Sequence, residues 1–252
     1  MNSTFWYISS IAPDTGALAR RHGLGVEIAE YCTAWNMDEK FAGTDKTVRA
    51  TIENVEKLTL HAPFNELFPC AIDPKARILA KERYLQAISL AENYGADRVV
   101  IHGGYNPRMY YPIWYTEQSA VFWREFMGEY AGKVRICLEN VFEETPDMLT
   151  DIIKAVSDPR LGMCLDIGHV NAYSKLAPLK WLETCAPYIY HYHIHNNSAD
   201  FDSHSALSDG TIPMKELLAA AAELTPDATK ALEVLEAAPS VNWLIENEFI
   251  EA

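Results

Sequence analysis

The sequence predicts a closed barrel of eight parallel strands, each followed by a helix, in one domain spanning residues 1–252. The length of 252 residues matches the roughly 250 that such a barrel needs. Short runs rich in Val, Ile, Leu and Tyr recur along the chain, and helical patterns fill the gaps between them. Hydrophobic residues make up 49% of the chain, which is enough for a large core.

The eight runs have the composition of strands that are buried in a parallel sheet. They occupy residues 5–8, 26–31, 58–61, 98–102, 134–139, 161–166, 189–195 and 231–235. Asp73 and Pro74 predict an N-cap and a first helical residue, and the helix that they open should end at Gly95. Thr145-Pro146 opens another helix in the same way, and the alanine-rich stretch 214–224 predicts a third.

Strands that alternate with helices imply parallel β–α units, and eight of them imply a closed barrel. The alternative is an open doubly wound sheet. No GxGxxG motif follows the first strand, which disfavours a dinucleotide-binding version of that alternative. The longest irregular stretches, 104–115 and 196–213, both follow strands. We therefore expect both at the carboxyl-end face, where barrels of this kind carry their active sites.

Composition argues against several classes of protein. The net charge of −14 and the absence of a basic run disfavour a nucleic-acid partner. No stretch of about 18 apolar residues predicts a membrane helix. The N-terminus lacks the pattern of a signal peptide, so a cytoplasmic location is the default expectation. The five cysteines show no CxxC spacing and are expected to be buried free thiols in a reducing compartment.

Six consecutive strands carry a His, Asp or Glu at the same end. One histidine at a strand end is usually a hydrogen-bonded core residue, but in a barrel six such ends converge on one mouth. Converging carboxylates would repel each other, and a cation is the simplest remedy. Mixed His and carboxylate ligands suit Zn²⁺, Mn²⁺ or Fe²⁺ better than Ca²⁺. We therefore expect a divalent metal cofactor, with Zn, Mn or Co as the candidates.

The seventh strand carries His191, His193 and His195, which alternate and should point to one side. Three ligands from one strand are not expected. One of these histidines should bind metal, while the others orient it or touch substrate. Trp114 is a candidate for stacking on a sugar ring, although such a tryptophan is more often a packing residue.

The strand-end residues, from about His61 to Glu233, resemble those of the xylose isomerase-like barrel superfamily, which includes sugar isomerases, ketose 3-epimerases and endonuclease IV. Ketose 3-epimerases hold one metal with Glu, Asp, His and Glu from strands five to eight. The matching residues here are Glu139, Asp166, His193 and Glu233. His193 is chosen because Asn196 stands three residues later, where the family has an acid or amide. The resemblance implies that the two glutamates are the acid/base pair.

Endonuclease IV uses a larger set of ligands for three zinc ions. The resemblance maps that set onto His61, His102, Glu139, Asp166, His169, His193, Asp202, His204 and Glu233. The segment DSHSALSDGTI is similar to that family's Asp-x-His and following motif. The chain departs from the pattern at Phe64, where endonuclease IV has a tyrosine, and it has no counterpart of the DNA-inserting loop after strand two.

The resemblance implies a metal-dependent isomerase or epimerase of a sugar, sugar phosphate or related polyol, working through an enediolate held on the metal. Glu139 and Glu233 would move the proton, and His169 is a further candidate catalytic residue. The candidate substrate contacts are His191, His195, Asn196 and Trp114. The alternative is an endonuclease IV-like phosphoesterase with two or three metals, and a third hypothesis is a non-catalytic metal site. Barrels of this type often form dimers or tetramers, which suggests a homo-oligomer.

Overall fold

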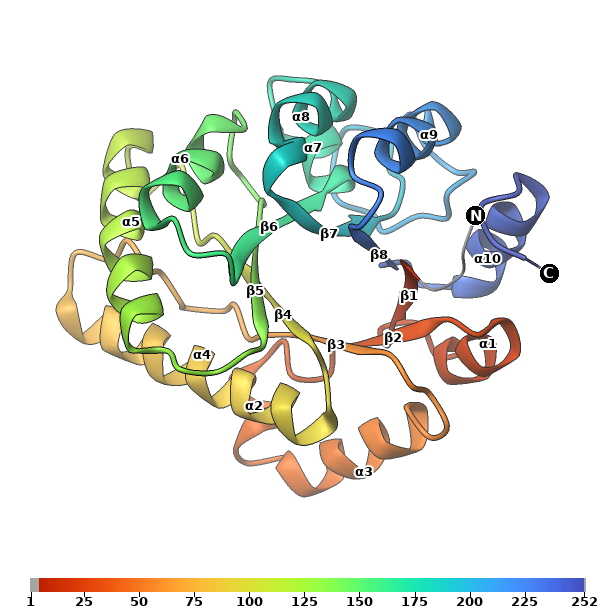
Figure 1. The fold of residues 1–252 in the computed structure, drawn as a ribbon, viewed down its shortest axis with the longest axis horizontal. Helices are drawn as coiled ribbons and strands as arrows, with labels where there is room; N and C mark the ends of the chain where they lie inside the picture. The colour runs from red at the N-terminus through yellow and green to blue at the C-terminus, as the bar shows by residue number, and fades with distance from the viewer. Residues whose placement is uncertain (1–4, 252) are drawn as a thin grey trace.

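The computed structural model describes residues 5–251 and confirms the closed barrel (Figure 1). Each strand pairs in parallel with the next one along the chain, and β1 pairs with β8, which closes the sheet. The alternative of an open sheet is therefore wrong. The strands are β1 (Trp6–Ser9), β2 (Gly25–Ile28), β3 (Leu58–His61), β4 (Arg98–His102), β5 (Arg135–Glu139), β6 (Leu161–Asp166), β7 (Ile189–Ile194) and β8 (Thr229–Leu232).

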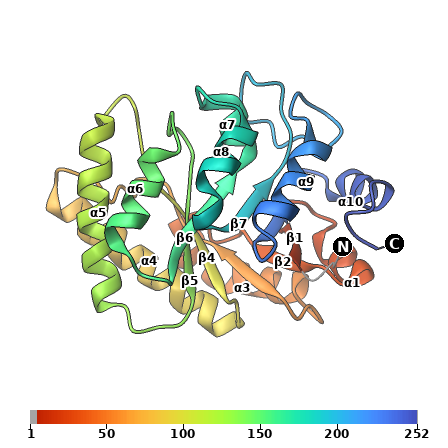
Figure 2. The ribbon, with the colours of Figure 1, turned by 45° about the horizontal axis from the view of Figure 1, so that its top comes forward.

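The helices form a ring outside the barrel, which Figure 1 shows along its axis and Figure 2 from an oblique angle. They are α1 (Thr15–His22), α2 (Ala34–Met37), α3 (Phe41–Thr51), α4 (Pro74–Tyr94), α5 (Pro112–Glu129), α6 (Asp147–Val156), α7 (Ile167–Tyr173), α8 (Pro178–Cys185), the 3-10 helix η2 (Ala186–Tyr188), α9 (Met214–Leu224) and α10 (Ala237–Glu246). Among the described residues, no helix combines the length and the apolar character needed to cross a membrane.

The predicted boundaries agree with the structure except at a few ends. Strands β3, β4 and β6 and helices α4 and α9 have the predicted bounds. The largest differences are in β2, which ends three residues before the predicted end, and in β8, which begins two residues and ends three residues earlier than predicted and includes Lys230. The Lys230 side chain is buried, and its ammonium group lies over the rings of Trp6 and Tyr192. The irregular stretch after β4 is also shorter than predicted, because α5 begins at Pro112.

Helix α4 begins and ends as its sequence signals predict. The side chain of Asp73 accepts a hydrogen bond of 2.8 Å from the backbone N–H of Lys75, which satisfies one donor of the first turn. Gly95 follows the last turn with a φ of 79°, in the left-handed region that favours glycine.

Replacing the N-cap Asp73 by Ala is expected to lower the free energy of unfolding by about 1 kcal/mol, because the Lys75 N–H then loses its acceptor. Thermal or urea unfolding monitored by circular dichroism measures this loss. The Asp73→Ser variant keeps a capping oxygen and should stay close to wild type. Equal losses in both variants would contradict a capping role for this side chain.

Apolar packing is divided between two places. The larger core lies between the strands and the surrounding helices and includes the fully buried Trp123 and Trp181. Inside the barrel, Val100, Cys137 and Cys164 form a small separate cluster. All five cysteines are free, as the sequence predicts, and four of them are buried, but Cys32 is only half-buried because it lines the pocket at the mouth. Because so few apolar side chains fill the barrel interior, space remains there for the buried polar residues that support the mouth.

Candidate metal centre

A pocket of about 430 Å³ opens at the carboxyl ends of the strands. Its floor consists of histidines and carboxylates, and its walls are largely apolar. The lining residues are Ile11, Ala29, Cys32, His61, Phe64, His102, Glu139, Val141, Phe142, His169, Tyr173, Asp202, His204, Glu233 and Leu235. The prediction that strand-end residues and the segment after β7 meet at one mouth is therefore confirmed by their positions.

Four residues converge most closely below this pocket: Glu139, Asp166, His193 and Glu233. Each offers one donor atom, and these four atoms all lie within 4.8 Å of one another. His193 is central, because its Nδ1 lies 3.1 Å from Glu139 Oε1, 3.1 Å from Glu233 Oε2 and 3.6 Å from Asp166 Oδ2. We call these four residues the tetrad. They are the set that the ketose 3-epimerase resemblance selects.

The other five candidate ligands surround the tetrad in one connected network. His61 Nε2 and His102 Nε2 lie 3.2 and 3.4 Å from Glu139 Oε2. The other side of Glu139 faces His169, whose Nδ1 is 3.3 Å from Oε1. His169 Nε2 lies 3.2 Å from Asp202 Oδ2. His204 Nε2 lies 2.9 Å from the same oxygen, so all nine candidate ligands are brought together.

The local fold explains how these side chains meet. In the parallel register, His102 lies opposite Glu139 and Asp166 lies opposite His193. Asp166 ends β6 and also caps α7, because its Oδ1 accepts the backbone N–H of His169 at 2.6 Å. Asn140 joins the ends of β5 and β6 by donating to the Asp166 carbonyl and accepting its N–H. The donors are therefore held by rigid strand ends.

The electrostatics of the tetrad favour ionised carboxylates. Burial alone would raise the pKa of Glu139, but the charge of His193 and the hydrogen bonds from His169 and His193 outweigh it and hold that pKa well below its usual value. The pKa of Glu233 is lowered mainly by His193, and that of Asp166 by His169 and His195, again against burial. The pKa of His193 is held well above its ordinary value, despite burial, by its neighbours Cys164, Glu233, Glu139 and Glu27.

The residues of the mouth fit a divalent cation. His193 Nδ1 faces two carboxylates but can donate its proton to only one, so Glu233 Oε2 is buried without a hydrogen-bond donor among the described residues. Asp202 Oδ1 is also buried and also lacks a hydrogen-bond donor among the described residues. Such uncompensated buried oxygens are costly, and a cation between them would offset the cost. His61 supports this fit, since its Nδ1 lies 2.9 Å from the Ala62 carbonyl and leaves Nε2 for a metal.

The candidate substrate contacts do not lie in the pocket wall. His191 and His195 are fully buried, with His191 against Glu27 and His195 Nε2 3.2 Å from both oxygens of Asp166. The Asn196 side chain fixes the segment after β7 through the carbonyl of Leu207 and the N–H of Ile212.

Trp114 also lies outside the set of residues that line the pocket. Its indole N–H donates to the carbonyl of Cys70 at 2.9 Å, and its ring packs against the outer core. Its role in the fold is packing, which was the alternative expectation for a tryptophan. We therefore no longer expect His191, His195, Asn196 or Trp114 to contact the substrate.

The walls of the pocket come from residues that sequence reasoning did not select as site residues, although it noted Phe64 as a departure from the endonuclease IV pattern. Phe64 stacks on His102 with ring centroids 4.2 Å apart, and Tyr173 stacks on His169 at 6.1 Å. Phe142 contacts Tyr173, and Leu235 follows β8 near the other end of the chain. Phe64, Phe142 and Leu235 each stand three residues after a strand end, which could have indicated them, whereas Tyr173 ends helix α7 and carried no specific signal.

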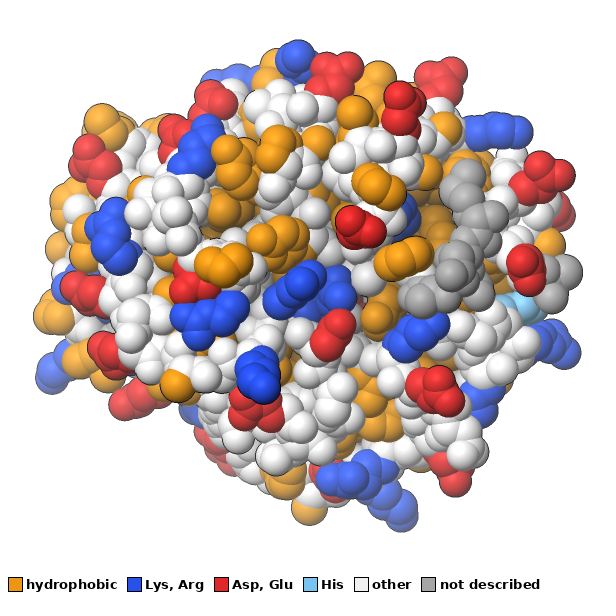
Figure 3. Space-filling view, viewed as in Figure 1, with side chains coloured by type: hydrophobic (Ala, Val, Ile, Leu, Met, Phe, Trp, Pro, Cys, Tyr) orange, Lys and Arg blue, Asp and Glu red, His pale blue; other side chains and the backbone are white. Residues whose placement is uncertain are grey.

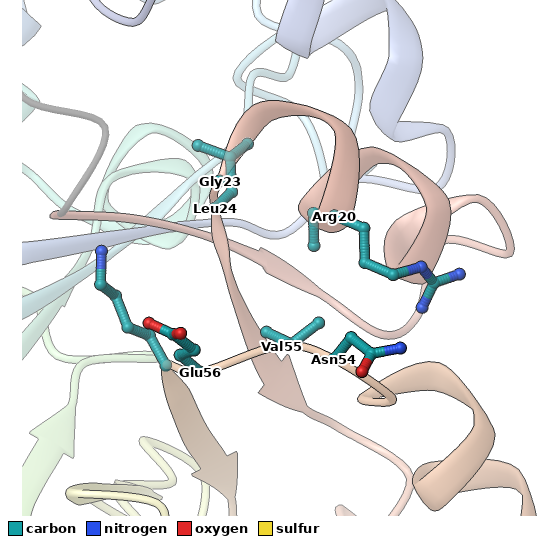
Figure 4. A pocket seen from close by; sticks show the side chains of 8 residues that line it. Arg20, Gly23, Leu24, Asn54, Val55 and Glu56 are labelled. Carbon is teal, nitrogen blue, oxygen red and sulfur yellow. The ribbon is translucent and has the colours of Figure 1, made fainter.

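A second hollow lies between the end of α1 and the segment before β3, and Figure 4 shows the residues that line it. Its volume is about 150 Å³. The guanidinium of Arg20 is engaged there, because it donates to the carbonyls of Thr51 and Glu53. This hollow therefore offers no cluster of groups for catalysis.

The family of the chain follows from comparison with known proteins. A family model described as a xylose isomerase-like TIM barrel matches residues 17–248. The chain belongs to this family. The resemblance seen in the strand-end residues is thus confirmed over nearly the whole sequence.

Two curated relatives are similar over part of their length. The uncharacterized protein MJ1311 of Methanocaldococcus jannaschii is 29% identical over 192 residues, which is 70% of this chain and 64% of that protein. A probable endonuclease 4 of Ureaplasma parvum is 28% identical over 125 residues, covering 47% of this chain and 41% of that protein. The matched region spans less than two thirds of either relative.

Two solved structures are similar over almost the full chain. A D-tagatose 3-epimerase-like protein is 25% identical with a TM-score of 0.77, covering 98% of this chain and 97% of that one. The TTHB071 protein of Thermus thermophilus, soaked with ZnCl₂, is 25% identical with a TM-score of 0.74, covering 97% of this chain and 98% of that one. Both similarities extend over the strand ends that carry the candidate ligands.

Proposed function

We propose that the protein is a divalent-metal-dependent epimerase or isomerase of a small sugar or polyol. The observation that carries this proposal is the tetrad, whose four donor atoms lie within 4.8 Å of one another beneath a pocket of about 430 Å³. Glu139, Asp166, His193 and Glu233 would hold the ion. When bound, the ion would supply positive charge to adjacent substrate oxygens. Similarity to a D-tagatose 3-epimerase-like protein supports the same class of chemistry.

In this proposal Glu139 and Glu233 transfer the proton. Their pKa values are lowered, so both are ionised near neutral pH and can act as bases. They come from β5 and β8, which are not neighbours in the barrel, and so they reach the pocket from different sides. One carboxylate removes the proton from the carbon next to the substrate carbonyl. The other takes a proton from solvent and delivers it to the opposite face, which inverts that carbon, and the first carboxyl then releases its proton to solvent.

The pocket favours a substrate without a phosphate group. Phosphate is commonly bound by Arg, Lys or a helix N-terminus. Among the described residues that line the pocket there is no Lys or Arg, and the apolar walls include Ile11, Phe64 and Leu235. We therefore propose an uncharged sugar or polyol.

Solvent deuterium exchange tests this function even when the product has not been identified. The protein, loaded with Mn²⁺ or Co²⁺, is incubated in D₂O with D-tagatose, D-fructose and D-fructose 6-phosphate, and the loss of the C3 proton is followed by NMR. We expect exchange with an unphosphorylated ketohexose and little or none with the phosphate ester. No exchange with any of the three by fully loaded protein would count against the proposed chemistry.

A second candidate function is phosphoester hydrolysis of the endonuclease IV kind. It is favoured by the nine connected ligands and by the similarity to a probable endonuclease 4. The charge opposes a DNA substrate, because the net charge is −14. Figure 3 shows one face of the barrel, which is not the face with the histidines of the mouth, and basic and acidic side chains are interspersed there. Cleavage of an abasic-site duplex by the zinc-loaded protein, with two or three ions per chain, would favour this function over epimerisation.

A further inference from the structure

Glu27 is a carboxylate inside the barrel that neither the sequence patterns nor the proposed proton transfer uses. It lies in β2, and its side chain is fully buried. An isolated buried carboxylate would be very costly, so its partners must compensate for its lost hydration. Those partners are two histidines of β7 and a hydroxyl of β3.

Each oxygen of Glu27 has its own histidine. Oε1 lies 3.0 Å from His193 Nε2, and Oε2 lies 3.0 Å from His191 Nε2. Thr59 donates its hydroxyl to Oε2 at 3.1 Å. Burial would raise the pKa of Glu27, but the charges and hydrogen bonds of His193 and His191 outweigh it and keep this group ionised.

The contact with His193 bears on the tetrad, because the two nitrogens of that ring face opposite ways. Nε2 faces Glu27, whereas Nδ1 faces Glu139 and Glu233. A neutral imidazole carries one proton, and a carboxylate beside Nε2 keeps the proton on that nitrogen. The lone pair of Nδ1 is then directed at the centre of the tetrad.

One histidine partner of Glu27, His191, is fixed by further hydrogen bonds deeper in the barrel, so Glu27 can hold the ring of His193 in place. His191 Nδ1 lies 2.5 Å from the hydroxyl of Thr229, and Arg98 donates to that same hydroxyl at 2.5 Å. Among the described residues, neither His193 Nε2 nor Glu27 Oε1 forms a hydrogen bond of regular geometry, and the two buried atoms face each other at 3.0 Å. Loss of Glu27 would therefore leave the buried nitrogen free to lose its proton or to rotate.

We propose that Glu27 is a positioning residue, which fixes the tautomer and orientation of His193 and strengthens its Nδ1 as a metal donor. This inference rests on the proposed metal site. Carboxylates that accept a hydrogen bond from a metal-binding histidine commonly contribute about 10–100-fold to metal affinity. Glu27 is not expected to touch the substrate, because it does not line the pocket.

The test is the affinity and the visible absorption spectrum of Co²⁺ in the full-length protein. Glu27→Gln should weaken Co²⁺ binding by about 10–100-fold in chelator competition and alter the Co²⁺ bands, which report ligand geometry. The matched control is Glu30→Gln, since the Glu30 carboxylate accepts a hydrogen bond from Ser10 and is not among the candidate ligands. Its affinity should stay within about twofold of wild type. Thermal melting without metal verifies that each variant is folded.

A second variant separates position from charge. Glu27→Asp keeps the negative charge but draws it back by one methylene from His193 Nε2, so binding should weaken here as well. If Glu27→Gln does not fold, Glu27→Asp provides the test of this role instead. Wild-type affinity and spectrum in either folded variant would overturn the role of Glu27. A wild-type protein that binds no Co²⁺ would overturn the metal site and this inference together, whereas a catalytic failure with normal binding would affect only the proposed reaction.

Discussion

Glu233→Gln should lower the rate of substrate proton exchange by about 10²–10⁴-fold in protein saturated with metal, because an amide cannot accept the proton. The Glu233 carboxylate is ionised at neutral pH and reaches the pocket from β8. The deuterium exchange assay with a ketohexose measures the loss directly. Metal content must be determined for each variant, since Glu233 is also a proposed ligand.

Glu139→Gln should lower the rate of epimerisation by a similar factor, because each glutamate serves one face of the substrate and inversion needs both. The matched control is Glu236→Gln, which removes an exposed carboxylate only three residues beyond Glu233 and should leave exchange unchanged. Exchange that persists in one glutamate variant while epimerisation stops would identify the other glutamate as the base that removes the proton. Full activity in both metal-loaded variants would rule out the assignment of the acid/base pair.

The sequence was sufficient to predict the barrel and the convergence of the candidate ligands, because both follow from short-range patterns. Parallel strands joined by helices have their carboxyl ends on one face, so polar residues that end consecutive strands must meet there. Glu139 and Asp166 end their strands in this way. The tetrad predicted from the family resemblance is also brought together in the structure.

The depth of each residue in the barrel could not be predicted from alternation. His191, His193 and His195 point to one side of β7, but alternate residues are separated by roughly 6–7 Å along a strand. His191 therefore lies beneath the tetrad against Glu27, and His193 lies at its centre. Glu27 itself gave no signal, since a single acid in the segment GVEI could equally have faced solvent. Its burial depends on contacts that exist only in the folded barrel, with Thr59 of β3 and with His191 and His193 of β7.

Metal affinity should increase with pH, by at most about tenfold per pH unit, because binding displaces one proton. The carboxylates of the tetrad have lowered pKa values and are ionised throughout, so they contribute no pH dependence. His193 has a raised pKa and keeps a proton on Nδ1 in the absence of metal, where it faces Glu139 and Glu233. An ion must displace this proton, which costs a factor of about 10 in affinity for each pH unit below the raised pKa.

Calorimetry in buffers of different ionisation enthalpy measures both the Co²⁺ affinity and the number of protons released. One ion in the tetrad should release about one proton, and the affinity should stop rising once the pH exceeds the pKa of His193. A pH-independent affinity would show that Nδ1 of His193 is not the donor. His204 provides a further distinction, because its contact with Asp202 outweighs burial and raises its pKa to about 9. Release of two or three protons would indicate that His204 and His169 also bind metal, which would favour phosphoester hydrolysis over epimerisation.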